Sequence, residues 1–198
     1  MVRTVQDDIR FIADRFPGKL FLKKYDLLDI DQLPVLIKST VAEHGPIGGF
    51  VHCAGFDKMA PLYMNKVSDI ETLWRLHALV PMVIIAAISK RKNYAEETSI
   101  VLISSQAAHE GAKGHTAYAA AKGAIEGFLA PAAAELMEKG IRINEVCLRI
   151  IRKRNRTDNN VSLGKRLFQF FIRVSFCHNI IDFCMIIHGN DFGAKGSH

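Results

Sequence analysis

Cysteine is scarce in this 198-residue chain: four thiols lie scattered at positions 53, 147, 177 and 184. This spacing matches no disulfide framework, which excludes a small disulfide-stapled domain and favours a reducing, cytoplasmic setting. No secretory signal peptide is expected either, because Asp7, Asp8 and Arg10 interrupt any apolar run near the N-terminus. Internal repeats and low-complexity linkers are missing as well, so a single domain over residues 1–198 is expected.

Acidic residues are few in one part of the chain. Residues 142–173 hold nine Arg or Lys against two acidic residues, and this local excess is larger than the net charge of +6 on the whole chain. Such a cluster suits a nucleic acid or an anionic membrane surface. However, no aromatic side chain that would stack on bases is interleaved within residues 149–156. We therefore expect a solvated run and no nucleic-acid partner.

The segment Leu167–Ile187 is apolar and near the length of a membrane span, but Arg173 and Asp182 interrupt it. Charges at membrane depth are costly, so we expect no membrane association, with a basic or tail-anchored membrane protein as an alternative. Residue types that bind metals also occur in or beside this segment: Cys177, His178, Cys184 and His188. Their spacing fits no standard zinc pattern, and no metal is expected.

The chain does contain short β-branched, apolar runs that alternate with helical segments. Ile100–Ile103, ending at Ser104 and Ser105, is typical of a buried parallel strand, and residues 141–147 and 49–55 indicate two more. An Ala-rich helix is predicted from Thr116 to about Lys139, with Pro131 as a bend or break. This pattern predicts an α/β sheet with its ligand site at the carboxyl ends of the strands.

One constellation of side chains carries chemistry. Tyr118 and Lys122 are four residues apart, which places them on the same face of the predicted helix, and Ser105 lies upstream at a strand end. A nearby cation favours the ionised form of a phenol, so we expect Lys122 to lower the pKa of Tyr118. A phenol adjusted in this way exchanges a proton with a carbonyl or an alcohol. The alternative is an ordinary solvated lysine beside a half-buried tyrosine.

These residues, with their order and spacing, resemble the short-chain dehydrogenase/reductase family over roughly residues 3 to 147, and most closely its 3-oxoacyl-(acyl-carrier-protein) reductase-like members. Four segments carry the resemblance: Cys53-Ala54-Gly55, with Cys in place of Asn; Ile103-Ser104-Ser105; Tyr118 to Lys122; and Gly140 to Asn144. The resemblance implies a Rossmann-like, doubly wound and mostly parallel sheet. In that fold Leu163–Val174 corresponds to a helix, and Phe183–Ile187 to the last strand.

The resemblance also implies hydride transfer between NADP, or NAD, and a small-molecule carbonyl or secondary alcohol, including 3-oxoacyl substrates linked to acyl-carrier protein. Tyr118 is then the general acid or base, Lys122 holds the ribose and lowers the pKa of Tyr118, and Ser105 binds the oxyanion. His77 stands near the position of the family's proton-relay asparagine, and a plain helix residue is the alternative reading.

Further positions correspond to the family's cofactor contacts, and the resemblance predicts a homo-oligomer. Asp26 matches an adenine-contacting Asp, and Cys53, Ala54 and Gly55 form the turn that approaches the adenosine. Arg3 follows the position of strand two, where an arginine favours the 2′-phosphate of NADP.

The chain departs from the family pattern in two places. The family's glycine-rich phosphate loop has no counterpart here, because the first residues of this chain correspond to the end of the family's second strand. In the family strand order 3-2-1-4-5-6-7 the first two strands are then lacking, which predicts a truncated domain with impaired cofactor binding. Residues 148–198 diverge from the family into a basic and apolar part. The alternative to an enzyme is a catalytically impaired remnant that acts as an oligomerisation or interaction module.

Overall fold

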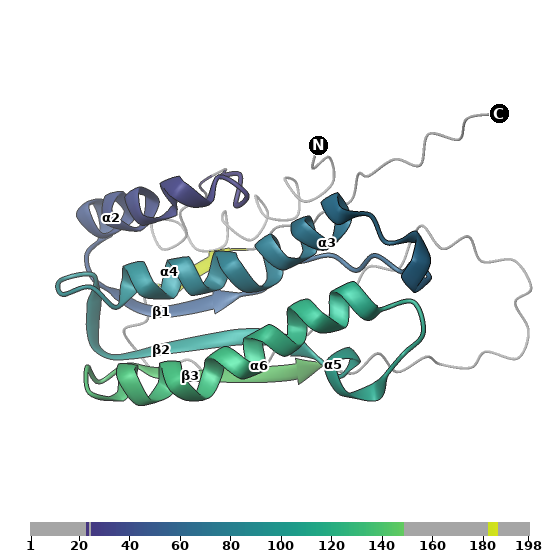
Figure 1. Ribbon diagram of the computed structural model, residues 1–198. Helices are drawn as coiled ribbons and strands as arrows, with labels where there is room; N and C mark the ends of the chain where they lie inside the picture. The colour runs from purple at the N-terminus through teal and green to yellow at the C-terminus, as the bar shows by residue number, and fades with distance from the viewer. Residues whose placement is uncertain (1–22, 24, 149–181, 186–198) are drawn as a thin grey trace, which may run out of the picture.

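The computed structural model describes residue 23 and residues 25–148 and 182–185 (Figure 1). The strands are β1 (Ile47–His52), β2 (Tyr94–Ser105), β3 (Arg142–Leu148) and β4 (Asp182–Met185). The α-helices are α2 (Leu33–His44), α3 (Val67–Trp74), α4 (Val80–Ile88), α5 (Ala107–Glu110) and α6 (Thr116–Met137). Shorter helical turns are η1 (Ile30–Gln32), η2 (Leu62–Met64) and the π-helical η3 (Arg75–Leu79).

The strands form one parallel sheet in the order β3-β2-β1-β4. The three strands predicted from sequence are confirmed, although β2 begins earlier, at Tyr94. Each crossover between neighbouring strands contains a helix, as parallel pairing requires. The carboxyl ends of β1, β2 and β3 therefore share one edge, next to α5 and the start of α6 (Figure 1).

The partner of β1 differs from the expectation for the last strand. In the family order, residues 183–187 would lie beside the 142–148 strand at the far edge. Instead, β4 pairs with β1, with Gly49 opposite Asp182 and His52 opposite Met185. β1 corresponds to the family's fourth strand, and β4 occupies the side of β1 where the family has its first strand. This pairing satisfies backbone groups of β1 that would be costly to leave buried and unpaired.

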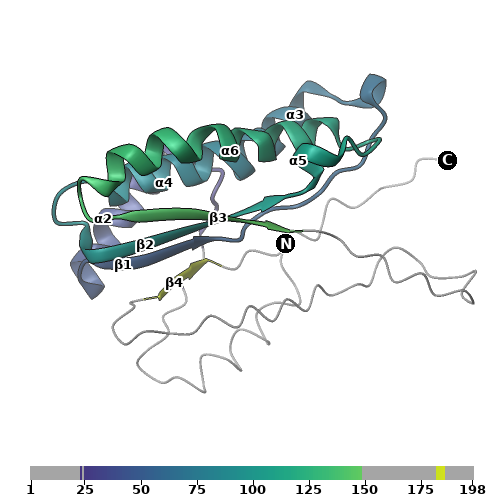
Figure 2. The same ribbon diagram turned by 90° about the horizontal axis from the view of Figure 1, so that it is seen from below.

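The helices α2, α4 and α6 lie side by side on one face of the sheet (Figures 1 and 2). Between the sheet and these helices lies a hydrophobic core, and its fully buried members include Leu33, Ile37, Phe50, Ile84, Ile88, Ile100, Leu102 and Ile125. On β2, every second residue from Thr98 to Ser104 is buried, which matches the period of a strand with one face in the core.

The segments α3, η3 and α4 are continuous, and η3 is a wide turn within this segment. Pro81 has no N–H to donate to the carbonyl of His77 four residues earlier, and this missing bond favours the π turn at Arg75–Leu79. By length and composition alone, Val67–Ile88 is apolar enough to cross a membrane. Its residues Val80, Ile84 and Ile88 are fully buried in the core, so much of this apolar character serves packing.

Helix α6 continues through Pro131, so of the bend or break expected from the sequence, the break is wrong. Ile125 before the proline and Leu136 after it are both buried, so both halves of the helix are held by packing. Pro131 itself is exposed, which leaves the carbonyl it cannot serve near solvent. The helix ends before Gly140, whose φ of +71° lies in the left-handed region that favours glycine.

Several predictions lie outside the described residues. They are the role of Arg3, the helix Leu163–Val174, and nearly all of the divergent part 148–198.

Candidate active site at the carboxyl ends of the strands

The site forms where β1 and β2 end and α6 begins. Ser105 is the last residue of β2, and Tyr118 and Lys122 lie on consecutive turns near the start of α6. The Ser105 side chain lies close enough to the Tyr118 phenol to lower its pKa, and its Oγ accepts a 3.2 Å hydrogen bond from the backbone N–H of Ala107. The Lys122 ammonium lies 5.7 Å from the centre of the Tyr118 ring. The structure therefore brings together the three residues that the sequence predicted.

Lys122 is unusual for a lysine because only 4% of it is exposed. Its Nζ donates a 2.6 Å hydrogen bond to the carbonyl oxygen of Ile103 on β2. Burial lowers the pKa of Lys122 to about 8. An ammonium has three N–H donors, so the bond to Ile103 leaves donor capacity for a further partner.

The pKa of Tyr118 moves opposite to the sequence-based expectation. Burial is the largest cause and raises the pKa above its ordinary value of 10; the hydrogen bond from Ser105 lowers it, and the charge of Asp57 raises it. The predicted lowering by Lys122 is thus wrong for the net shift, because desolvation of the phenolate dominates. Tyr118 is a protonated phenol at neutral pH.

His77 lies in the π turn, buried beside Tyr118. The two rings meet edge to face, with centres 5.2 Å apart, and His77 Nε2 lies 2.8 Å from the carbonyl oxygen of Phe56. Its Nδ1 is buried and has no hydrogen-bond partner among the described residues. Burial, and then the charge of Lys122, lower the pKa of His77 to about 3, so the imidazole is neutral.

The turn after β1 packs directly against His77. A Cβ at Gly55 would overlap Cε1 of the imidazole and lie 2.8 Å from its Nδ1. Glycine is therefore required here for the close approach of the His77 ring. Ala54 is buried, and Cys53 is exposed but close enough to Lys122 to influence its pKa.

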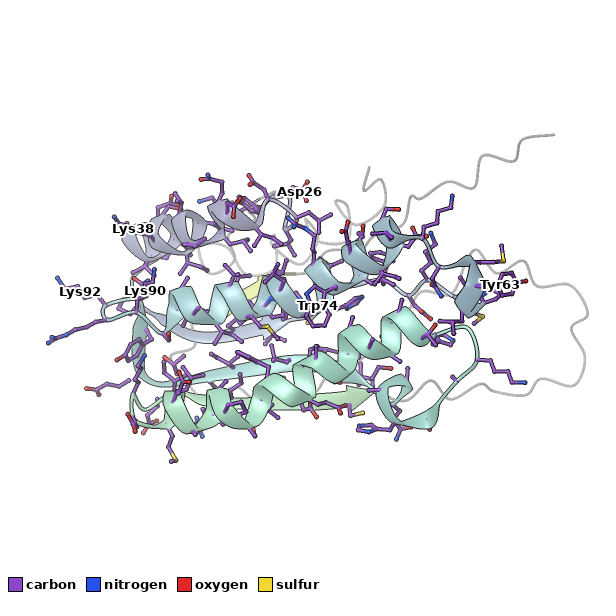
Figure 3. All side chains as sticks on the ribbon, viewed as in Figure 1. Asp26, Lys38, Tyr63, Trp74, Lys90 and Lys92 are labelled. Carbon is purple, nitrogen blue, oxygen red and sulfur yellow. The ribbon has the colours of Figure 1, made fainter. Side chains whose placement is uncertain are left out.

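Asp26 lies apart from this group, in the turn before α2 and on the side of the molecule away from α6 (Figure 3). Its side-chain Oδ1 accepts a 3.0 Å hydrogen bond from the backbone N–H of Leu28. Asp26 thus stabilises its own turn and lies apart from Tyr118 and Lys122.

Sequence reasoning missed three histidine and acidic side chains around the site. His52, on β1, is 1% exposed; its Nε2 lies 3.1 Å from the carbonyl oxygen of Leu76, and burial lowers its pKa to about 4. The period-two alternation with Phe50 is a sequence signal for this inward direction. Asp57 and His115 form a 3.2 Å ion pair near Tyr118, and no local pattern predicts that contact.

A parallel sheet with crossover helices and a Ser–Tyr–Lys group at its strand ends defines a Rossmann-type α/β protein with an oxidoreductase-like site. The family model described as short chain dehydrogenase matches residues 6–162. The chain belongs to this family.

Among curated relatives, the chain is 29% identical over 138 residues to the 3-oxoacyl-[acyl-carrier-protein] reductase of Thermotoga maritima, which covers 68% of this chain and 54% of the relative. It is 28% identical to the vibriobactin-specific 2,3-dihydro-2,3-dihydroxybenzoate dehydrogenase of Vibrio cholerae, over 68% of this chain and 52% of that protein. The chain thus spans about half the length of the curated relatives it matches.

Solved structures agree on the fold. A dehydrogenase/reductase from Sinorhizobium meliloti superposes with a TM-score of 0.65 at 24% identity, covering 73% of this chain and 58% of that one. An NADPH-bound short chain oxidoreductase from Pseudomonas aeruginosa, described as containing an atypical catalytic center, gives a TM-score of 0.64 at 20% identity, covering 71% and 55%.

Proposed function

We propose that this protein is an NAD(P)-dependent oxidoreductase that interconverts a carbonyl compound and a secondary alcohol. The convergence of Ser105 and Tyr118, with the buried Lys122 beside the Tyr118 ring, is the observation that carries the proposal. A donor pair at the carboxyl ends of parallel strands suits a substrate oxygen that gains negative charge.

The roles of the side chains follow from their protonation states. Tyr118 stays protonated at neutral pH, so it is the proton donor when a carbonyl is reduced. Ser105 donates a hydrogen bond to the same oxygen, and the positive charge of Lys122 favours the phenolate that remains. Alcohol oxidation requires the phenolate first, so oxidation should rise with pH while reduction falls.

A nicotinamide cofactor fits the described part of the site by its chemistry. Lys122 keeps donors beyond its bond to Ile103, and ribose hydroxyls are suitable acceptors for an ammonium. When bound, the cofactor supplies or accepts the hydride. Tyr118, Lys122 and the Cys53–Gly55 turn would hold its ribose side. Asp26 as an adenosine contact, and Arg3 as the basis for NADP over NAD, remain proposals.

His77 is proposed as a positioning residue. Its neutral imidazole packs on the edge of the Tyr118 ring and is held by the Phe56 carbonyl, so it fixes the direction of the phenol. Its low pKa argues against a net proton gain at neutral pH, while its unpartnered Nδ1 is an acceptor for a proton passed along a relay.

We further propose a small-molecule substrate with an apolar portion, in the manner of a 3-oxoacyl group. A cavity of about 420 Å³ lies beside the site, between η2, the loop before α6 and the first turns of α6. It is lined by small and apolar residues such as Pro61, Leu62, Ala107 and Ala119. The name of the Thermotoga maritima relative is consistent with such a substrate.

We further propose that the protein acts in the cytoplasm.

The decisive experiment compares Tyr118→Phe with Tyr94→Phe in the full chain, using NADPH and a panel of 3-oxoacyl thioesters and secondary alcohols. Tyr94 begins β2, at the end of the strand opposite Ser105, and serves as the matched control. We expect Tyr118→Phe to reduce turnover by about 10²–10⁴-fold and the control to leave it unchanged. Retained activity in Tyr118→Phe, with a native circular dichroism spectrum, refutes the assignment.

A non-catalytic interaction module is the second candidate, and one observation favours association. Large apolar side chains are exposed along η2 and α3: Met59, Leu62, Tyr63, Met64, Val67, Ile70 and Trp74. Exposed apolar patches of this kind mark association surfaces, which also supports the proposed homo-oligomer. Ile70→Lys with Trp74→Lys should lower the molar mass measured by light scattering. A wild-type chain that assembles but neither binds NADPH nor turns over substrate favours this candidate.

A further inference from the structure

A second group of reactive side chains gathers on the outer side of α6, one turn beyond Lys122. His109 comes from α5, Glu126 from α6 and Cys147 from the exposed edge of β3. His109 Nε2 and Glu126 Oε1 are 2.8 Å apart. The imidazole nitrogen, a carboxylate oxygen and the thiol sulfur all lie within 4.8 Å of one another.

The register of the sheet explains this convergence. Ser104 is paired with Cys147, and Leu102 with Glu145, so Cys147 and Glu145 face the same side as the buried Ser104 and Leu102. That side is covered by α6, where Glu126 lies 3.5 Å from the Ser104 hydroxyl. Three segments distant in sequence thus present one donor atom each to the same point.

We propose that His109, Glu126 and Cys147 form a Zn²⁺-binding site. Nitrogen, sulfur and oxygen donors together match the borderline preference of zinc, whereas magnesium and calcium take oxygen ligands alone. Ligands on a tetrahedral zinc are about 3.5 Å apart, given bonds of roughly 2.0–2.3 Å. The present separations require only a small inward movement of exposed side chains.

Glu145 is an independent observation at the same place. Its Oε2 is buried and has no hydrogen-bond partner among residues 23, 25–148 and 182–185. The charges of Glu126 and His109 both act on this carboxylate. A cation held by His109, Glu126 and Cys147 would satisfy this buried, unpaired carboxylate oxygen through a bound water.

The surroundings of the thiol favour a cation as well. Three acidic side chains, Glu126, Glu145 and Glu110, lie close enough to Cys147 to act on it electrostatically, and a bound cation offsets their negative charges. On binding, the S–H bond breaks, the proton passes to the buffer and the thiolate forms the zinc–sulfur bond.

The test measures Zn²⁺ affinity of the full chain by calorimetry with a competing chelator, and Co²⁺ substitution by absorption. We expect one site, with a thiolate-to-cobalt charge-transfer band. Cys147→Ser and Glu126→Gln should each weaken binding by at least about tenfold. Cys53→Ser is the matched control, since Cys53 is also an exposed cysteine and lies outside the cluster.

Thermal unfolding gives a second readout. Zn²⁺ at a hundredfold excess over its Kd should raise the Tm by roughly 5–10 °C in the wild type and the control, and less in Cys147→Ser. The proposal is overturned if Zn²⁺ does not bind or if Cys147→Ser and Glu126→Gln bind as tightly as wild type. It is equally overturned if affinity disappears in a Cys177→Ser/Cys184→Ser variant while both cluster variants retain it.

Discussion

Two polar clusters lie along helix α6, near the carboxyl ends of the strands. They differ in how deeply their side chains are buried and in the sign of their charge. The inner cluster is basic: Lys122, His52 and His77 are all buried. The outer cluster is acidic and more open: Glu126 and Glu145 stand beside Cys147 and His109, whose side chain is 60% exposed. Lys122 and Glu126 are one turn apart on the same helix. The difference between their environments therefore comes from how deeply each side chain is buried and from the charges beside it, and not from the secondary structure that carries them.

The direction of each pKa shift shows what the two clusters lack. In the inner cluster, burial lowers the pKa values of His52, His77 and Lys122, and the charge of Lys122 lowers those of the two histidines further. In the outer cluster, burial and carboxylate neighbours raise the pKa values of Glu145 and Cys147, so these groups resist their negative charge. The two histidines of the inner cluster are therefore neutral at pH 7, whereas the carboxylates of the outer cluster would be stabilised by a cation.

Acid should break the inner cluster first, and this is the largest expected effect. The folded pKa values of His52 and His77, about 4 and about 3, lie below the ordinary 6.5, so the unfolded state binds more protons as pH falls. Stability is complete above pH 6.5 and is lost as pH falls toward 4 and 3. By pH 5 each histidine should cost on the order of 2 kcal/mol.

Urea unfolding at pH 7 and pH 5 measures this loss. A His52→Gln variant should lose about half of the pH dependence. A free energy of unfolding that stays constant between pH 7 and pH 5 in the wild type would show that these imidazoles are not buried as neutral groups.

A pair of glycine substitutions separates the dense inner cluster from the open outer one. Gly55→Ala places a Cβ into the His77 ring and should destabilise the fold by about 1–3 kcal/mol. Gly127→Ala, next to Glu126, meets nothing within 4 Å and should stabilise helix α6 by about 0.5–1 kcal/mol. Both values come from denaturant midpoints, and equal effects of the two substitutions would contradict the difference in packing.

Lys122→Met tests whether the inner bases are coupled. The charge of Lys122 lowers the pKa of both His52 and His77, so removing it should raise both histidine pKa values toward 6.5. The pH dependence of stability between pH 7 and pH 5 should become shallower as a result. Histidine proton resonances followed over a pH titration measure the shifts directly, with Lys139→Met, an exposed lysine beyond the end of α6, as the control.

The group formed by Ser105, Tyr118 and Lys122 was more predictable from sequence than the outer cluster. Tyr118 and Lys122 share a helix, and Ser105 ends an apolar strand, so local spacing and the known edge of a parallel sheet suffice to bring them together. The direction of the Tyr118 pKa was not predictable, because it depends on how deeply the phenol is buried. The outer cluster needs the register between Ser104 and Cys147, which no local pattern contains.

The pairing of β4 with β1 was likewise beyond sequence reasoning. A short apolar run such as Asp182–Met185 forms a strand at either edge of a sheet with the same local pattern. The choice between the β1 edge and the β3 edge depends on which backbone groups would otherwise stay buried and unpaired. That can be judged only once the sheet is assembled. The family order therefore gave the correct sequence of β1, β2 and β3 and the wrong neighbour for the last strand.

The smallest expected effect concerns the outer cluster in the absence of metal. Glu126 raises the pKa of Cys147, so Glu126→Gln should lower that pKa and increase the thiolate fraction at pH 8. With chelator present, alkylation of Cys147 by iodoacetamide should become about two- to threefold faster, because the remaining acids Glu145 and Glu110 still oppose ionisation. Peptide mass spectrometry compares Cys147 with Cys53 in the same sample. Slower alkylation of Cys147 in Glu126→Gln, at constant alkylation of Cys53, would mean that Glu126 acts on the thiol as a proton acceptor and not through its charge.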